Sequence, residues 1–146
     1  MTLYIIGAAI LLAFVFFGFW ARRQEKKRLQ QAEEFYELPQ IKALLDSGFI
    51  KGDDEISGEI NDYPAGLYCW FEVTGTRYFT YIRCKMPAGV SYIFQFGNRY
   101  EQEQVRITNL NMIRQELKQI DGATLAKSFA RLQEIAALEK LERVKL

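Results

Sequence analysis

The residue types that most often carry catalysis are scarce in this sequence. The chain has two cysteines and no histidine, which excludes histidine metal sites, Ser-His and Cys-His dyads and acid–base chemistry by imidazole. Two thiolates cannot build a four-ligand structural zinc site within one chain. No phosphate-binding glycine loop, nucleophile elbow or dinucleotide fingerprint occurs. We therefore expect no catalytic residues, no cofactor and no metal site. An enzyme based on cysteine or a carboxylate remains the catalytic alternative.

The two cysteines are the residues with the clearest redox chemistry. Cys69 and Cys84 fall on the same face of a predicted β-hairpin, where we expect them to be diagonal neighbours. Diagonal pairs lie about 7–8 Å apart between Cα atoms, slightly beyond normal disulfide reach. The cytoplasmic side, which the charge pattern below predicts, is also reducing. The sequence therefore predicts two buried apolar thiols rather than a redox pair.

Both faces of this hairpin are apolar in their middle. With Gly75-Thr76 as a two-residue loop that has glycine first, one face pairs Val73 with Tyr78, Phe71 with Thr80, Cys69 with Ile82 and Leu67 with Cys84. We expect this face to be the core. The other face is aromatic in the middle and charged at its rim, and it carries Tyr68, Trp70, Glu72, Arg77, Phe79, Tyr81 and Arg83. Such a hairpin is either covered on both sides or left open on one side for a partner.

Six residues of that second face form a candidate partner or ligand site: Tyr68, Trp70, Arg77, Phe79, Tyr81 and Arg83. Three uses remain open: core packing under a helix, docking of another protein, or lining of an aromatic cavity for a small ligand. Tyr, Trp and Arg are favoured at the centres of protein interfaces. Aromatic rings with arginines also stack bases, but residues 31–146 carry a net charge of −3. Because phosphate binding needs a basic face, nucleic acid is not an expected partner.

The hairpin is part of an internal repeat. Residues 64–78 (PAGLYCWFEVTGTRY) and 87–100 (PAGVSYIFQFGNRY) share Pro-Ala-Gly, Phe, Gly and Arg-Tyr in the same order. Pro-Ala-Gly suits a turn with proline second and glycine fourth, and a strand rich in aromatic and β-branched residues follows each copy. The pattern predicts two consecutive hairpins within an antiparallel meander of about five strands.

These elements follow a strongly apolar N-terminus. Leu3 to Trp20 contains no charge and no proline, and 18 residues of helix span roughly 27 Å, close to the hydrocarbon core of a membrane. Tyr4 and Trp20 stand at its ends, where such rings prefer the headgroup level. A cleaved secretory signal is the alternative, but the positive leading segment and the small-residue cleavage site are missing. We predict a transmembrane anchor over residues 1–21.

A basic segment follows the apolar stretch at once, and its charges are Arg22, Arg23, Lys26, Lys27 and Arg28. Nothing basic precedes the stretch, so the positive-inside rule places the N-terminus outside and the rest of the chain in the cytoplasm. The same charges attract anionic lipid headgroups at about 1 kcal/mol each near the surface, or they only set the topology. Residues 22–38 contain helix formers without glycine or an interior proline, and we predict a helical juxtamembrane stalk.

Residues 39–146 then form one small α+β domain. Gln40 to Ser47 reads as a short helix that Gly48 caps, after which Phe49 and Ile50 are expected to pack on the domain. Alternating residues 55–61 predict a strand, and Val105 and Ile107 resume the strand signal after a polar segment. Two C-terminal helices are expected, from residue 108 or 109 to Ile120 and from about Thr124 to Val144, with Leu138 facing the sheet.

These features favour a single-pass cell-membrane protein with a cytoplasmic α+β domain. The preferred function is non-catalytic, as a protein-interaction or assembly module that binds another protein. The alternative is a membrane-tethered domain that holds a small ligand or lipid in an aromatic cavity.

Overall fold

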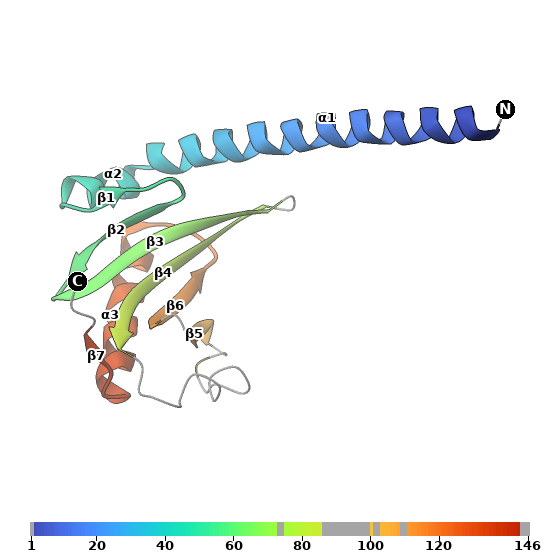
Figure 1. The fold of residues 1–146 in the computed structure, drawn as a ribbon. Coiled ribbons are helices and arrows are strands. Elements are labelled where there is room, and N and C mark those ends of the chain that lie inside the picture. Colours follow the sequence, from blue (N-terminus) through green and yellow to red (C-terminus); the bar gives the residue numbers. More distant parts are fainter. Residues whose placement is uncertain (1, 73–74, 86–99, 101–102, 109–110, 144–146) are drawn as a thin grey trace.

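The computed structural model describes residues 2–72, 75–85, 100, 103–108 and 111–143. It confirms the predicted α+β class: a long apolar N-terminal helix leads into an antiparallel sheet, and a C-terminal helix packs on that sheet (Figure 1). Within the described residues the sheet has six strands in one path and a short seventh strand at its end.

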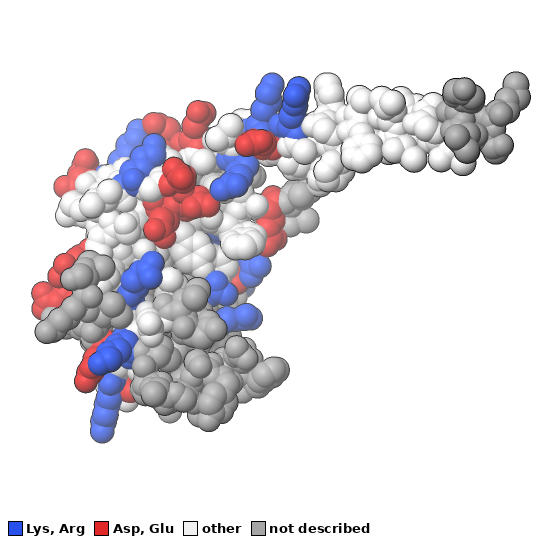
Figure 2. Space-filling view, in the orientation of Figure 1, with Lys and Arg blue, Asp and Glu red and all other residues white. Residues whose placement is uncertain are grey.

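The N-terminal helix, α1, runs over Thr2–Glu37. At about 1.5 Å per residue, its 36 residues measure roughly 54 Å. None of the described residues in its apolar half is buried, and large side chains such as Leu12, Phe14 and Phe16 are 70–76% exposed. Figure 2 shows this half as an uncharged rod, with lysines and arginines gathered where it meets the domain. This helix is long and apolar enough to span a membrane, by length and composition.

The other end of α1 is built into the domain. Phe35 is 1% exposed and Tyr36 is also buried, and both rings belong to a core cluster that includes Ile56 and Leu67 of the sheet. The Tyr36 hydroxyl donates a hydrogen bond to the Gly52 carbonyl at 2.6 Å. The predicted stalk is therefore the second half of the same continuous helix, and its last turn is a core element.

The break after α1 is the one that proline predicts. Leu38 is extended, and Pro39 occupies the first turn of α2, Pro39–Asp46, where its missing N–H costs nothing. Gly48 follows the helix with a φ of +106°, which suits glycine at a helix end. Phe49 is buried as expected. The expectation for Ile50 is wrong, because its side chain is 72% exposed on an edge strand.

All strand pairs are antiparallel. The strands are β1 Ile50–Lys51, β2 Glu55–Ile60, β3 Tyr63–Glu72, β4 Gly75–Lys85, β5 Val105–Thr108, β6 Met112–Leu117 and β7 Glu142–Arg143. Their order is β1-β2-β3-β4-β6-β5, and β7 pairs with the end of β4. The sheet departs from the predicted meander in one place: β6 lies between β4 and β5. The second copy of the repeat, residues 87–100, lies outside the described residues except for Tyr100.

The C-terminal helix α3, Gly122–Leu138, covers one face of the sheet (Figure 1). The Asp121 carboxylate caps it by accepting a hydrogen bond from the Thr124 N–H at 2.8 Å. Phe129, Leu132 and Ile135 join Ile82 and Ile113 of the sheet in a core cluster. A buried polar contact also ties the layers together, since the Thr80 and Ser128 hydroxyls are hydrogen-bonded and Ser128 donates to Gln115.

The predicted register of the β3–β4 hairpin is wrong by four residues. Leu67 pairs with Thr80 rather than Cys84, and Cys69 pairs with Tyr78 rather than Ile82. Glu72 pairs with Gly75, so Gly75 begins β4, and Gly75-Thr76 is not the loop. The residues between, 73–74, lie outside the description. Cross-strand packing, such as the Tyr68 ring stacked 5.0 Å from Phe79, outweighs the local turn preference. The shift is even, so each side chain keeps its predicted face.

The predicted helix up to Ile120 is also wrong, because residues 112–117 form strand β6. A turn that includes Asn111, with a φ of +54°, precedes the strand, and Ile107 then pairs with Ile113. The last helix ends at Leu138 rather than Val144. Leu138 is 60% exposed, and Leu141 is buried instead, because the chain reverses at Lys140 (φ +54°) and adds β7.

Gly66 provides a test of this packing. A Cβ at Gly66 would lie 2.5 Å from both the Ile56 carbonyl oxygen and the Tyr81 hydroxyl. We predict that Gly66→Ala lowers the free energy of unfolding by about 1–3 kcal/mol, measured by urea denaturation of the full chain in detergent. Gly122→Ala is the matched control, since a Cβ there meets nothing within 4 Å. Equal stability of both variants would contradict the packing around Gly66.

Candidate functional site

The face of the sheet opposite α3 carries the predicted aromatic and charged residues, in cross-strand rows. One row runs from Gly66 through Tyr81 and Arg114 to Arg106. The next contains Tyr68, Phe79 and Glu116, followed by Trp70 opposite Arg77. We call this side the open face, defined by Tyr68, Trp70, Glu72, Arg77, Phe79, Tyr81, Gln104, Arg106, Arg114 and Glu116.

The six predicted site residues lie together, but at different depths. Trp70 is 58% exposed and Arg77 is exposed, whereas Phe79 and Tyr81 are buried. The Tyr81 ring lies over Gly66, where no side chain competes for the space, and Arg83 lies 5.5 Å from that ring. Burial raises the pKa of the Tyr81 hydroxyl. The inner rings therefore form the base of the open face, and Trp70 and Arg77 are exposed above them.

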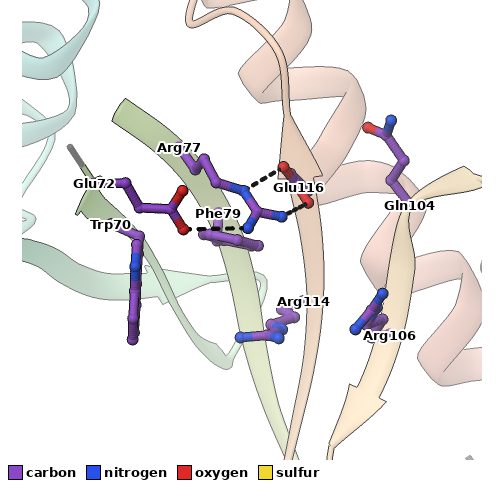
Figure 3. Close-up of a pocket in the computed structure, with 8 residues that line it drawn as sticks. All are labelled: Trp70, Glu72, Arg77, Phe79, Gln104, Arg106, Arg114 and Glu116. Atoms are coloured by element: carbon purple, nitrogen blue, oxygen red, sulfur yellow. Dashed lines mark hydrogen bonds and ion pairs between the residues drawn. The ribbon is translucent and has the colours of Figure 1, made fainter. Parts of the chain in front are cut away.

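A groove of about 370 Å³ runs along the open face (Figure 3). It is lined by Trp70, Glu72, Arg77, Phe79, Gln104, Arg106, Arg114 and Glu116. Five of these side chains are charged, and strands β3, β4, β5 and β6 all contribute. The groove therefore combines one exposed aromatic ring with charged side chains and is not an apolar pocket.

Arg77 is neutralised within the groove. Its Nε and Nη2 atoms donate to the two Glu116 carboxylate oxygens at 2.8 and 2.6 Å, and Nη1 lies 3.5 Å from Glu72. The hydrogen bonds from Arg77 hold the pKa of the Glu116 carboxyl below its usual range, and they raise the pKa of Arg77 in turn. This bidentate pair fixes the edge of the groove nearest the hairpin end.

Arg114 and Arg106 have no such partner. Nη1 of Arg114 donates to the Tyr68 hydroxyl at 2.7 Å, and its guanidinium lies 5.0 Å from the centre of the Phe79 ring. Arg106 is directly opposite Arg114 in the β5–β6 register. Among the described residues neither arginine forms a salt bridge, although the nearby Glu116 carboxylate, which is paired with Arg77, attracts both. Two like charges placed opposite each other destabilise a sheet, and a bound anionic group would relieve this repulsion.

The cysteines are placed differently from the prediction. Both are buried free thiols, as expected. They are not diagonal neighbours, however: Cys69 pairs with Tyr78, and Cys84 lies six positions further along β4, a separation of about 20 Å. Burial raises the pKa of Cys84 to about 12 and raises that of Cys69 as well. Neither thiol is therefore ionised near neutral pH, and the two cannot form a disulfide within this fold.

The predicted lipid-contact residues lie on one continuous helix, although the side chain of Tyr4 is outside the description. Trp20 packs 6.0 Å from Phe17 at the end of the apolar half. Arg22, Arg23, Lys26, Lys27 and Arg28 follow it on α1, and Arg28 forms an exposed salt bridge of 3.2 Å with Asp54. In the described part of the chain, no group of three or more His, Cys, Asp or Glu residues could hold a metal ion.

Sequence reasoning missed four residues of the groove: Gln104, Arg106, Arg114 and Glu116. The last two fell in a segment predicted as helix, so their strand faces were not considered. The alternation of apolar Val105, Ile107 and Ile113 with charged neighbours is the signal that points to paired strands. A second hollow was also missed, an apolar groove of about 520 Å³ between α2 and α3, lined by residues that include Leu44, Leu125 and Phe129.

No family model, curated protein or solved structure matches this chain. The function proposed below is therefore inferred from the geometry of α1 and of the domain.

The repulsion between Arg106 and Arg114 can be measured as a change in the free energy of unfolding. We predict that Arg106→Gln raises the free energy of unfolding by about 0.2–1 kcal/mol, because it removes a like-charge pair. The gain should shrink at high salt, where exposed charges are screened. Urea denaturation at low and high salt measures both effects. Lys118→Gln removes the same charge from an exposed position outside the strand pair and serves as control. A loss of stability in Arg106→Gln would contradict the repulsion.

Proposed function

We propose that this chain is a single-pass membrane protein whose tethered domain is a non-catalytic module that binds another protein through the open face. One observation carries the proposal: the groove has exposed Trp70 on its β3 side and, across β4, Arg114 and Arg106, two arginines without ion pairs among the described residues. Tyr, Trp and Arg are the residues that dominate binding energy at protein interfaces. A partner segment that carries carboxylates complements these charges.

The shape of the groove supports a docked chain more than an enclosed small molecule. Five of its eight lining residues are charged, whereas small-molecule sites are mainly apolar with few polar groups. The aromatic rings of the open face also pack on one another, with Tyr68 and Phe79 stacked. The alternative function, binding of a small ligand or lipid, draws separate support from the apolar groove between α2 and α3, whose volume of about 520 Å³ suits such a ligand.

The membrane part of the proposal combines α1 with its charges. The apolar half of α1 has the length of a span, and the five bases follow on its C-terminal side. The positive-inside rule then orients the domain toward the cytoplasm and the short N-terminus outward. A cytoplasmic domain agrees with the presence of two reduced, buried thiols.

Site-specific photocrosslinking in cells tests the binding face. A photoreactive residue at Glu72 or Gln104 is expected to give the same adduct, because both line the groove and Trp70 is retained. The same residue at Lys127, exposed on α3, is the control and should give none. Arg106→Glu should remove most of the adduct at Gln104 by reversing the charge of the groove. Absence of adducts at the groove positions, or an equal adduct from Lys127, would contradict the proposal.

Cysteine accessibility tests the orientation. We expect a cysteine at Lys127 to stay unlabelled by a membrane-impermeant maleimide in intact cells and to react fully after lysis. The native chain is the background, because Cys69 and Cys84 are buried. Labelling of intact cells would place the domain outside and reverse the proposed topology.

A further inference from the structure

The hairpin end, by which we mean the described residues 71–72 and 75–76 where β3 ends and β4 begins, lies on the side of the domain that faces the basic part of α1 (Figure 1). Phe71 and Glu72, at the end of β3, line a cleft of about 570 Å³. The opposite wall is α1, through Trp20, Ala21, Gln24, Glu25, Lys27, Arg28 and Gln31. The hairpin therefore points back along α1 toward the apolar half of the helix.

The depth of this cleft follows from helix geometry. Its α1 residues form two rows in which positions are three or four apart, 20-24-27-31 and 21-25-28. The two rows together make one face of three helical turns. Each turn rises about 5.4 Å, and a headgroup layer is about 5–7 Å thick on each side of the hydrocarbon core. If Trp20 sits at the membrane interface, the first turn of the cleft, from Trp20 to Gln24, lies at headgroup depth.

We propose that the end of the β3–β4 hairpin is a second membrane contact, which docks on anionic phospholipid headgroups beside α1. The proposal rests on the membrane span proposed above. It commits to lipid as the occupant because the cleft continues directly from the apolar half of α1.

The chemistry of the region fits a lipid surface. Lys27 and Arg28 line the cleft together with Phe71, and Arg28 also forms its salt bridge with Asp54. Arg22, Arg23 and Lys26 lie on the same part of α1 outside the cleft lining, and a base near the surface attracts anionic headgroups at about 1 kcal/mol. Aromatic rings are favoured at headgroup depth, and the cleft places Trp20 on one wall and Phe71 on the other. The carboxylates Glu25 and Glu72 also line the cleft. Attraction to an anionic lipid surface therefore depends on the bases of residues 22–28 on α1.

A second contact has a consequence for the open face. A domain held by one helix can tilt about the point of entry, whereas a domain that also rests on its hairpin has a fixed tilt. Glu72 lines both the cleft and the groove, so the groove begins where the hairpin meets the membrane. A partner therefore reaches Trp70 and Arg77 along the membrane surface, as a membrane protein or a membrane-proximal segment does.

Spin-label accessibility in vesicles tests this contact. A nitroxide at Thr76→Cys reports the hairpin end, since Thr76 pairs with Phe71 and is partly exposed. The full chain is reconstituted in vesicles of phosphatidylcholine and phosphatidylglycerol with a small fraction of nickel-chelating lipid, which relaxes labels at headgroup depth. Leu12→Cys reports the proposed span, and Ala137→Cys reports the exposed far end of α3. The unsubstituted chain measures any labelling of the buried native cysteines.

The expected result is a several-fold greater relaxation of the Thr76 label than of the Ala137 label, reduced when phosphatidylcholine replaces all phosphatidylglycerol. The Leu12 label should be accessible to oxygen and protected from a water-soluble nickel chelate. Equal relaxation at Thr76 and Ala137, with Leu12 protected, would overturn the hairpin contact and leave the span intact. An aqueous environment at Leu12 would instead overturn the span, and the hairpin contact with it.

Discussion

The burial of Phe35 and Tyr36 is the constraint on which the rest of the structure depends. These two residues end the same helix whose first half is exposed and apolar, and their rings pack 5.0 Å apart, with Phe35 also stacked on Tyr78 of β4. Burial raises the pKa of Tyr36 to about 12, so its hydroxyl keeps its proton and its hydrogen bond to Gly52. Because full burial of a large apolar side chain is worth about 1.5–3 kcal/mol, the last turn of α1 is a structural part of the domain.

The two faces of the sheet differ in how they are covered. One face is closed by α3, whose position is fixed by apolar packing and by the buried contact between Thr80 and Ser128. The other face keeps Trp70 exposed and sets two arginines opposite each other, an arrangement that lowers stability. Arg114 is held by its hydrogen bond to Tyr68 and its contact with the Phe79 ring, whereas Arg106 makes no ion pair among the described residues, and an anionic group on the proposed partner would complement this charge. The net negative charge of residues 31–146 makes this local positive charge more distinct.

The elements that sequence reasoning predicted well are those with a strong local signal. The apolar stretch forms a helix, Pro39 begins α2 and Gly48 follows the end of α2, each where expected. Each of these outcomes depends on the backbone or the solvation of the residues themselves rather than on distant contacts. The faces of the β3–β4 hairpin were also predictable, because an even shift of register leaves every side chain on its face. The pairing of Arg106 with Arg114 was not predictable from the sequence. It depends on strands β5 and β6 pairing, and the apolar residues Leu110, Ile113, Leu117 and Ile120 have the spacing of a helix, which led to a helix prediction for this segment. The insertion of β6 between β4 and β5 is likewise a long-range outcome that no local pattern specifies.

We infer that α1 and the domain form one rigid body, so that the proposed membrane span would set the direction of the open face. The most direct test is a pulsed EPR distance between nitroxides at Leu29→Cys on α1 and Lys127→Cys on α3, both exposed, in the full chain reconstituted in vesicles. A single narrow distance distribution is predicted, because Phe35 and Tyr36 anchor the helix in the core. A broad distribution would show that the domain swings freely on its helix and would contradict the account.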